Sequence, residues 1–386
     1  MPEGVDGPWC LQQIEGRQLA VGKLPKWAAN DDLWFPSRLS IEQCSSEATA
    51  LYKRQIIERL LPNPADRQSM IDFTGGMGVD FSFIAPLFLD AVYVEKQKSL
   101  CDIARHNLPL LGLPNAKIVN TESSMTPHLL PRGGENTPPL GEVWRGLAFL
   151  DPARRDNAGR KMVALEDCTP DVVAMQDWLL ENAHIVMVKL SPMLDISMLL
   201  RKLTHVKEIH VVSVRGECKE LLVVLSKDKD IKGRILFCVN LESDDPAITR
   251  SLDEKATRLP VLADEMGAFL YEPNASVLKA GVQDSVGQQL GLRKLHPNSN
   301  LFTGDEWTTD FPGRSFVVEG TSGFGKRELR NFLQDITQAN ITVRNFPAST
   351  AELRKKLDLK EGGETYLFAT TMKDGQHRLV RCRKAI

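Results

Sequence analysis

The segment Ile71-Asp-Phe-Thr-Gly-Gly-Met-Gly-Val-Asp80 decides the fold of this chain of 386 residues. An apolar run over residues 70–73 leads into a glycine-rich turn, after which apolar residues recur at helical spacing from Phe81 onward. This order predicts a strand, a tight loop and a helix, the start of a Rossmann-like unit. A dinucleotide fingerprint, G-x-G-x-x-G, would need a third glycine where Phe81 stands, so the glycine spacing disfavours NAD.

The composition bounds the kind of protein. Hydrophobic residues make up 42% and charged residues 25% of the chain, as in ordinary globular proteins. The length exceeds the roughly 250–300 residues at which single cores tend to divide, so two or three domains are expected. No apolar run reaches the roughly 20 residues that cross a bilayer, and the N-terminus lacks a signal peptide pattern. Seven scattered cysteines without C-x-x-C spacing disfavour disulfides and a zinc site, so we expect a cytoplasmic, metal-free protein.

The net charge of −2 gives no global field that would attract nucleic acid, so any such binding must come from local basic patches. Each of these patches is also compatible with a merely solvated face. Three clusters are candidates: Arg154, Arg155, Arg160 and Lys161; Arg354, Lys355 and Lys356; and Arg378, Arg381, Arg383 and Lys384.

The pattern along the chain predicts four regions. Residues 1–68 form an N-terminal helical region, with a helix over 47–61 that ends at Pro62. Residues 69–226 alternate apolar strands with helices and predict a seven-stranded, doubly wound α/β sheet. Its last two strands, near 210–214 and 221–225, are too close for a parallel crossover and predict an antiparallel hairpin. Residues 227–314 and 315–386 mix short strands and helices and predict an α+β C-terminal part.

Two carboxylates at strand ends bear on the cofactor: Asp72 indicates which one the loop binds, whereas Glu95 would serve any nucleoside cofactor, NAD included. Asp72-x-x-x-Gly76-x-Gly78 resembles the S-adenosylmethionine (SAM) loop of class I methyltransferases, in which the acidic residue lies near the methionine end of the cofactor. Glu95, at the end of the second strand, predicts a carboxylate that accepts hydrogen bonds from the ribose hydroxyls. After the third strand, Glu122 or Ser123 could reach the adenine edge, or belong to an ordinary polar loop. The predicted cofactor residues are Asp72, Thr74, Gly75, Gly76, Gly78, Glu95, Glu122 and Ser123.

Asp151-Pro-Ala-Arg-Arg155 follows an apolar strand at the edge where open α/β sheets bind ligands. It resembles the D/N-P-P-Y/F/W motif of methyltransferases that act on exocyclic amines, but Ala153 and Arg154 replace the second proline and the aromatic residue. We therefore predict catalytic roles for Asp151, Pro152 and Arg154, with Arg155 near the substrate. Lys189, after the fifth strand, either neutralises substrate phosphate or pairs with an acid.

Upstream, polar residues precede the helix at 47–61. Ser46 is suited to cap this helix. Ser45, Ser46 and Glu47 also predict a lid over the cofactor or the substrate. Cys44 would suit a nucleophile for pyrimidine methylation, although nothing else in the sequence supports that role.

As a whole, the chain resembles a bacterial family of class I SAM-dependent methyltransferases with a THUMP-like C-terminal domain. The resemblance is carried by segments beginning at Glu42, Asp72 and Asp151, and downstream by Tyr271-Glu-Pro-Asn274, Leu295-His-Pro-Asn298, Val343-Arg-Asn-Phe-Pro347 and Gly363-Glu-Thr-Tyr-Leu-Phe368. It implies a Rossmann-like seven-stranded methyltransferase sheet, an N-terminal helical region and a C-terminal α+β domain with ferredoxin-like and THUMP-like parts. THUMP domains accompany enzymes that modify transfer RNA, so the resemblance also implies RNA.

The leading hypothesis is SAM-dependent methylation of a base nitrogen in structured RNA, either tRNA or rRNA. Two alternatives remain open. One is an RNA-binding module with a non-catalytic SAM-binding fold, and the other is a methyltransferase that acts on a small molecule or a protein.

Overall fold

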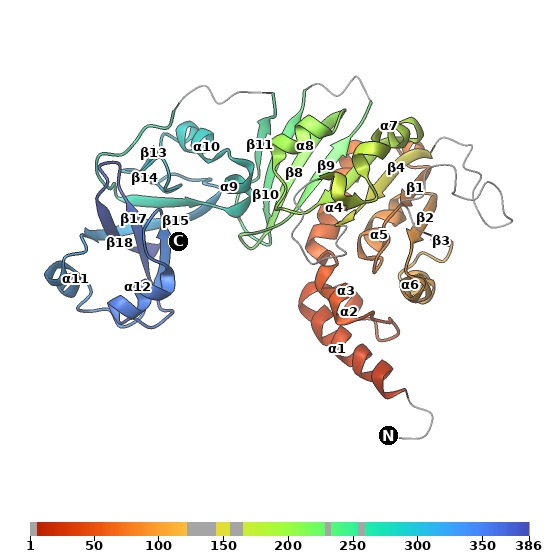
Figure 1. The fold of residues 1–386 in the computed structure, drawn as a ribbon, viewed down its shortest axis with the longest axis horizontal. Coiled ribbons are helices and arrows are strands. Elements are labelled where there is room, and N and C mark those ends of the chain that lie inside the picture. The colour runs from red at the N-terminus through yellow and green to blue at the C-terminus, as the bar shows by residue number, and fades with distance from the viewer. Residues whose placement is uncertain (1–5, 122–143, 155–164, 228–232, 254–258, 386) are drawn as a thin grey trace. The chain divides into compact units, whose positions relative to one another are not determined.

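The computed structural model describes residues 6–121, 144–154, 165–227, 233–253 and 259–385 (Figure 1). The chain divides into two compact units. The first comprises residues 1–212 and 219–235, and the second comprises residues 213–218 and 236–386.

The first unit begins with helices, as the sequence predicted. Asp6 caps α1 by accepting a hydrogen bond from the Trp9 N–H, and Ser46 caps α4 in the same way through Thr49. The core of this region includes Trp27 and Phe35 and continues into Met77 beside the glycine loop. The elements are α1 (Gly7–Lys23), α2 (Pro25–Ala28), α3 (Arg38–Gln43), α4 (Glu47–Leu60) and the 3-10 turn η1 (Pro64–Asp66).

A sheet follows in which β3, β2, β1, β4 and β7 are parallel neighbours. β9 runs antiparallel to β7 and lies next to β8, the strand with which the sequence predicts that it forms a hairpin. The strands are β1 (Ser69–Asp72), β2 (Asp90–Glu95), β3 (Lys117–Asn120), β4 (Trp144–Leu150), β7 (Ala183–Leu190), β8 (Val206–Val214) and β9 (Glu217–Leu225). The connecting helices are α5 (Val79–Ile84), η2 (Ala85–Leu87), α6 (Lys98–Leu110), η3 (Leu165–Asp167), α7 (Val172–Asn182) and α8 (Ile196–Lys202). Two short strands, β5 (Ala153–Arg154) and β6 (Cys168–Thr169), pair with each other.

The predicted number of strands was wrong in one respect. The sheet has nine strands in the order β11-β10-β8-β9-β7-β4-β1-β2-β3, because β10 (Ile235–Leu241) and β11 (Ile248–Ser251) extend it beyond β8. Both strands lie within residues 227–314, which the sequence pattern places in the C-terminal part. A strand at the edge of a sheet presents unpaired backbone groups, and such an edge is open to a further strand.

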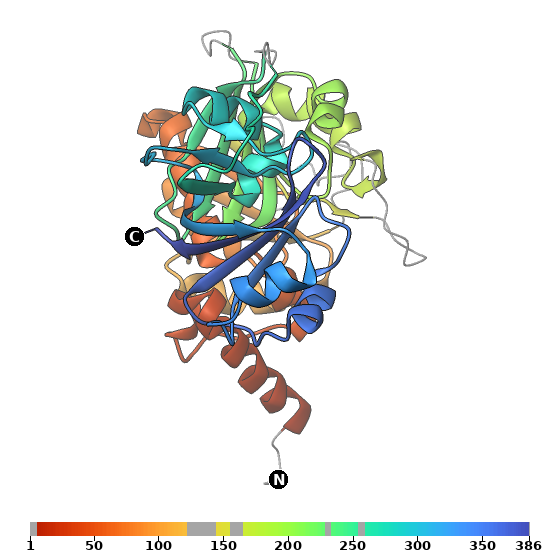
Figure 2. The same cartoon turned by 90° about the vertical axis from the view of Figure 1, so that its left-hand side faces the viewer.

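The second unit contains a seven-stranded sheet in the order β13-β14-β12-β15-β18-β17-β16. Its strands are β12 (Phe269–Pro273), β13 (Arg293–Lys294), β14 (Phe302–Gly304), β15 (Gly313–Ser322), β16 (Asn340–Arg344), β17 (Thr365–Thr371) and β18 (His377–Lys384). Its helices are α9 (Ala275–Ala280), α10 (Gln283–Gln289), α11 (Lys326–Phe332) and α12 (Thr350–Leu357). One apolar cluster joins α11 and α12 to β16, β17 and β18 through Leu329, Leu353 and Leu367 among others, so both helices pack on the same side of these strands (Figure 2).

Three further observations concern the described residues. None of their helices is long and apolar enough to cross a membrane. All seven cysteines are free thiols. Among the residues that the structure describes, no group of three or more His, Cys, Asp or Glu side chains is arranged to hold a metal ion.

Candidate active site

The ends of β1, β2, β4 and β7 form one wall of a pocket of about 220 Å³ in the first unit. Parallel neighbours bring their carboxyl ends to the same edge, which is where α/β sheets of this kind bind ligands. Several residues predicted from the sequence lie together in its lining: Ser45, Asp72, Thr74, Gly75, Gly76, Gly78, Glu95, Asp151 and Lys189.

The glycine loop owes its shape to two left-handed residues and to a tyrosine beneath it. Gly76 and Gly78 have φ of +56° and +86°, values that side chains other than glycine rarely adopt. A Cβ added to Gly75 would lie 2.1 Å from the ring of Tyr93. The Tyr93 hydroxyl donates to the Gly76 carbonyl at 2.5 Å, and Gly75 N–H donates to Val94 O at 2.8 Å. The loop is thus held against β2.

Asp72, at the end of β1, is a buried carboxyl without a basic partner among the described residues. It is 1% exposed and accepts hydrogen bonds from the backbone N–H of Thr74 at 2.9 Å and from its hydroxyl at 3.3 Å. Burial raises the pKa of Asp72 to about 8, against the effect of the Thr74 N–H. A cationic group that enters the pocket would favour its ionised form.

Glu95, at the end of β2, is anchored by two backbone groups of the pocket wall. Its Oε2 accepts from Gly76 N–H at 2.9 Å, and its Oε1 accepts from Gln97 N–H at 2.8 Å. A carboxylate has about four lone-pair sites, so each oxygen retains capacity for one more donor. This arrangement suits a group with two adjacent hydroxyls.

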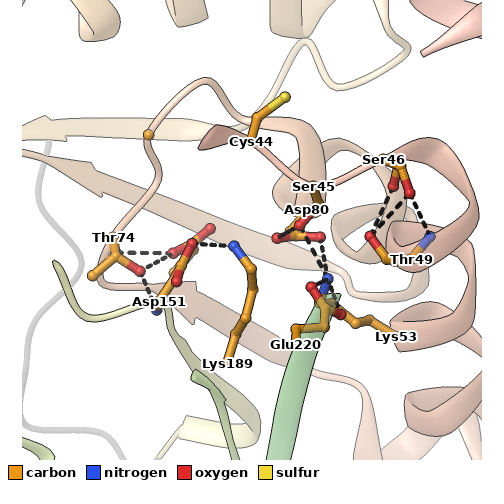
Figure 3. A network of polar contacts seen from close by, with 12 residues as sticks. Cys44, Ser45, Ser46, Thr49, Lys53, Thr74, Asp80, Asp151, Lys189 and Glu220 are labelled. Atoms are coloured by element: carbon orange, nitrogen blue, oxygen red, sulfur yellow. Dashed lines mark hydrogen bonds and ion pairs between the residues drawn. The ribbon is translucent and has the colours of Figure 1, made fainter. Parts of the chain in front are cut away.

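Asp151 and Lys189 also line the pocket, and their side chains contact each other (Figure 3). The backbone N–H of Asp151 donates to Thr74 Oγ1 at 2.6 Å, which joins the end of β4 to the glycine loop. The Lys189 ammonium forms an ion pair with the Asp151 carboxylate. Of the two roles that the sequence allowed for Lys189, pairing with an acid is therefore the one observed. The side chains of Lys189 and Asp151 are 12% and 39% exposed, so the pair remains accessible.

Next to this pair lies a buried group of charges that the sequence analysis missed (Figure 3). Lys53, on α4, is fully buried, and its Nζ lies 3.0 Å from Asp80 Oδ1 and 2.7 Å from Glu220 Oε1. Ser45 Oγ donates to Asp80 Oδ2 at 2.7 Å and accepts from Lys53 Nζ at 3.1 Å. Ser45 and Asp80 line the pocket, and Lys53 and Glu220 lie behind them as their charged partners.

These charges set one another's ionisation. Burial alone would lower the pKa of Lys189, but the carboxylates of Asp151, Asp80 and Glu220 outweigh it and raise that pKa well above its usual range. Burial likewise opposes ionisation of Asp80, yet Lys53 and Lys189 leave its pKa lowered. Lys189 is therefore an ammonium at any physiological pH.

The other predicted site residues have different surroundings. Ser46 caps α4, and Glu47 accepts a hydrogen bond from the Lys26 N–H at 2.8 Å; neither lines the pocket. Pro152 is also absent from the lining. Cys44 does line it, but burial raises the pKa of its thiol, which disfavours a thiolate nucleophile. The backbone of Arg154 forms β5, whereas its side chain and the residues Glu122, Ser123 and Arg155 lie outside the described part of the chain.

One signal for the missed lysine was present in the sequence. Lys53 lies three residues after Ala50 and four before Ile57, on the apolar face of its helix, and all three are buried. A lysine at such a position needs a buried partner. Nothing local in the sequence identifies Asp80 and Glu220 as those partners.

Comparison with known proteins shows the family to which the chain belongs. Residues 269–312 match a family model for a ferredoxin-like domain, and residues 313–384 match one described as THUMP domain-like. A crystal structure of a Porphyromonas gingivalis W83 protein, described as a methyltransferase, is 34% identical in sequence, with a TM-score of 0.84 over 98% of this chain and 90% of that one. The chain belongs to the SAM-dependent methyltransferases with a THUMP-like C-terminal domain.

Curated relatives name the cofactor. Two Mycobacterium tuberculosis proteins, from strains CDC 1551 and H37Rv, are called uncharacterized S-adenosylmethionine-dependent methyltransferases. Each is 25% identical to this methyltransferase over 365 residues, which cover 92% of this chain and 90% of the relative. SAM is accordingly the cofactor of the enzyme. The pocket fits it, because an unpaired buried carboxyl, Asp72, and an anchored carboxylate, Glu95, match its cationic amino group and its ribose diol.

Proposed function

We propose that this methyltransferase acts on structured RNA, either tRNA or rRNA. The observation that carries the proposal is the THUMP domain-like region over residues 313–384, which has a basic surface on two of its helices. RNA recognition needs local positive charge here, because the whole chain carries a net charge of −2.

The basic surface lies on α11 and α12. Both helices bury Leu329 and Leu353 against the same strands, and their opposite faces are exposed. Its exposed cations are Lys326, Arg327, Arg330, Lys355 and Lys356, against the acids Glu328 and Glu352 on the same helices. Lys356 also lies over the ring of Phe324, 5.7 Å from its centroid. We call this set of five cations the basic helix face.

The predicted cluster at the C-terminus is a weaker candidate for RNA contact. Arg381 forms two ion-paired contacts with Asp335, at 2.9 and 3.0 Å, and a third with Glu319 at 3.1 Å. Its charge is already balanced within the fold. Arg354, from the second cluster, points back to the Ala339 carbonyl at 3.3 Å. The basic helix face therefore supports RNA binding better than these arginines do.

In the first unit, different pocket residues would bind different parts of SAM and of the methyl acceptor. Asp72 would bind the amino group of the methionine portion, Glu95 would accept from the ribose hydroxyls, and Gly76 and Gly78 would allow close approach of the backbone. SAM supplies a methyl group that its sulfonium has already activated. Asp151 and Lys189 would hold the acceptor in line with that methyl group, and such positioning can lower the barrier greatly.

The Asp151-Pro152 motif predicts a base nitrogen as the acceptor. We also propose a cytoplasmic location, which the seven free thiols support, since reducing compartments keep cysteines unpaired.

Labelled methyl transfer tests the proposed function. The purified full-length protein is incubated with radiolabelled SAM and total RNA from a strain that lacks the gene. We expect label that ribonuclease releases, and a methylated nucleoside that is missing from the RNA of that strain by mass spectrometry. Label that resists ribonuclease would indicate a protein or small-molecule substrate. No transfer to any RNA, together with retained SAM and RNA binding, would favour a non-catalytic RNA-binding module.

Two variants locate the RNA contact. Replacing Lys355 and Lys356 together by alanine should weaken RNA binding and reduce the slope of log affinity against log salt by about 1.4 to 1.8, since each phosphate contact contributes about 0.7–0.9. Lys202→Ala removes an exposed lysine of the first unit and should leave the slope unchanged. Equal slopes in all three proteins would exclude the basic helix face as the RNA-binding surface.

A further inference from the structure

The Asp151–Lys189 pair, which we call the acceptor end of the pocket because the methyl acceptor would bind there, presents a hydrogen-bond donor beside a hydrogen-bond acceptor. The ammonium of Lys189 can only donate, and the carboxylate oxygens of Asp151 accept. Both side chains line the pocket and both retain some exposure. A group that binds between them must therefore accept from one and donate to the other.

Few single atoms in RNA that can accept a methyl group have that property, because a base edge meets it only with two adjacent atoms, as adenine does with its exocyclic amine and a ring nitrogen. The exocyclic nitrogen itself offers N–H donors to a carboxylate but has no free lone pair for an ammonium. A ring nitrogen such as N7 of a purine offers a lone pair and no donor. A hydroxyl group is at once a donor and an acceptor, so it satisfies both Asp151 and Lys189. In RNA the only hydroxyl on every nucleotide within the chain is the ribose 2′-hydroxyl.

We infer that the acceptor of this methyltransferase is a ribose 2′-hydroxyl of RNA, bound between Asp151 and Lys189. The inference rests on the proposed action on RNA and names the reacting atom. It replaces the base nitrogen predicted from Asp151-Pro152. The departures of the sequence from the amine motif at Ala153 and Arg154 agree with a different acceptor.

The reaction balances with these two side chains. The 2′-oxygen attacks the methyl carbon, an O–CH3 bond forms, and the CH3–S bond breaks with its electron pair left on a neutral thioether. As the new bond forms, the oxygen becomes strongly acidic, and its proton passes to the Asp151 carboxylate, from which it is lost to water. The Lys189 ammonium positions the oxygen and stabilises the negative charge that the oxygen gains as its proton moves to Asp151.

The buried charges beside the pair keep Lys189 in the state that this role requires. The negative charges of Asp80 and Glu220 favour the protonated form of Lys189, and Lys53 forms ion pairs with both of these carboxylates. The carboxyl groups of Asp151, Asp80 and Glu220 outnumber the two lysines, so loss of the proton from Lys189 would leave them with still less compensating positive charge.

The products distinguish this inference from the proposed function itself. A 2′-O-methyl group blocks alkaline cleavage of the adjacent phosphodiester, because that cleavage requires the free 2′-hydroxyl. RNA labelled by the enzyme is therefore digested with sodium hydroxide and separated. We expect the label in alkali-stable dinucleotides. Label in mononucleotides that carry a methylated base would overturn the 2′-hydroxyl and leave RNA methylation intact, whereas absence of label from RNA would overturn the proposed function.

A substrate change tests the same atom without any change in the protein. An RNA oligonucleotide with a single 2′-deoxynucleotide at the labelled position should bind with affinity within about threefold of the parent, since most affinity comes from phosphate contacts, but accept no methyl group. Methylation of the deoxy oligonucleotide at more than about a tenth of the parent rate would overturn the inference.

A protein variant tests Lys189. Lys189→Met should lower the rate of transfer by about 10²–10³, as removal of a group that stabilises an oxyanion does. Binding of SAM and of RNA, measured by calorimetry and fluorescence anisotropy, should remain within about threefold. Lys202→Met, an exposed lysine on α8, is the matched control and should transfer at the parent rate. Because Lys189→Met removes a buried partner of Asp151, Lys189→Arg is measured beside it. Transfer by both variants within tenfold of the parent would overturn the role of Lys189.

Discussion

The two ends of the pocket are built in opposite ways. The cofactor end contains Asp72, a buried carboxyl that no described basic side chain pairs with, and a loop held by backbone groups. The acceptor end contains Asp151 and the buried neighbours Asp80 and Glu220, which are paired with Lys189 or Lys53. Both ends line the same pocket.

This difference follows from what each end has to do. A carboxyl without a counter-ion is costly to ionise in a buried site, so it favours a ligand that brings its own positive charge. Carboxylates already neutralised by lysines gain little from a cationic ligand and instead offer fixed donors and acceptors to a neutral one. The cofactor end is thus complementary to a cation, and the acceptor end to a polar neutral group.

The largest expected effect comes from breaking the acceptor end at Lys53. Lys53→Met would leave Asp80 and Glu220 buried together without their shared cation, which should lower the free energy of unfolding by about 3–5 kcal/mol. Urea denaturation measures the change. Lys202→Met, which removes an ion pair with Glu166 on the surface, should cost less than about 1 kcal/mol. If both variants lost the same free energy of unfolding, the buried ion pairs of Lys53 would stabilise the protein no more than a surface ion pair does.

The same network shows why sequence reasoning reached only part of the acceptor end. Lys53 and Glu220 are separated by 167 positions in the chain, and only the pairing of β9 against β7 brings Glu220 beside Lys189. No spacing in the sequence records that contact. Asp151 and Lys189 could both be predicted, because each lies at the carboxyl end of a strand, at the ligand-binding edge of the sheet. The partners that give this pair its chemistry depend on tertiary packing.

The next effect concerns the rigidity of the cofactor end. In Gly75→Ala the new methyl group would lie 2.1 Å from the ring of Tyr93, and this overpacking should cost about 1–3 kcal/mol and weaken SAM binding. Gly22→Ala is the matched control, because a Cβ there meets nothing within 4 Å and its helical position should stabilise the protein by about 0.5–1 kcal/mol. Thermal unfolding and calorimetry with SAM measure both. Normal stability and affinity in Gly75→Ala would show that Tyr93 does not fix the loop.

Asp72 makes the two ends differ in their response to pH. Its pKa is about 8 in the folded protein and 3.8 as an ordinary aspartate, so between these values the folded state binds a proton that the unfolded state has lost. The stability that this carboxyl contributes is therefore complete below pH 3.8 and is lost as the pH rises toward 8, with a limiting slope of about 1.4 kcal/mol per pH unit. Asp72→Asn should remove that part of the slope when unfolding is followed from pH 5 to pH 8. Parallel curves for the two proteins would contradict the raised pKa.

More of the cofactor end could be predicted, because its parts are adjacent in sequence. The strand, loop and helix from Ile71 to Asp80 form one continuous segment, and Glu95 ends the next strand. Periodicity and glycine placement report such local structure directly. Tyr93 was missed because its position two residues before Glu95 in a buried strand looks like ordinary core. The two extra strands of the sheet were missed because pairing at the open edge is set by tertiary structure rather than by local pattern.

The smallest expected effect separates the ribose contact from the rest of the cofactor end. In Glu95→Gln one carboxylate oxygen becomes an amide nitrogen, so one of the bonds from Gly76 or Gln97 is lost, together with part of the capacity for ribose hydroxyls. A loss of about 0.5–1.5 kcal/mol corresponds to roughly three- to tenfold weaker binding of both SAM and adenosine. Asp72→Asn should instead weaken SAM and leave adenosine unaffected, since adenosine has no charged amino group. Glu58→Gln, at a half-buried position outside the pocket lining, serves as the control, with both affinities unchanged. If Glu95→Gln weakened SAM but not adenosine, Glu95 would act on the methionine portion, and the division of the cofactor end between these two carboxyls would be wrong.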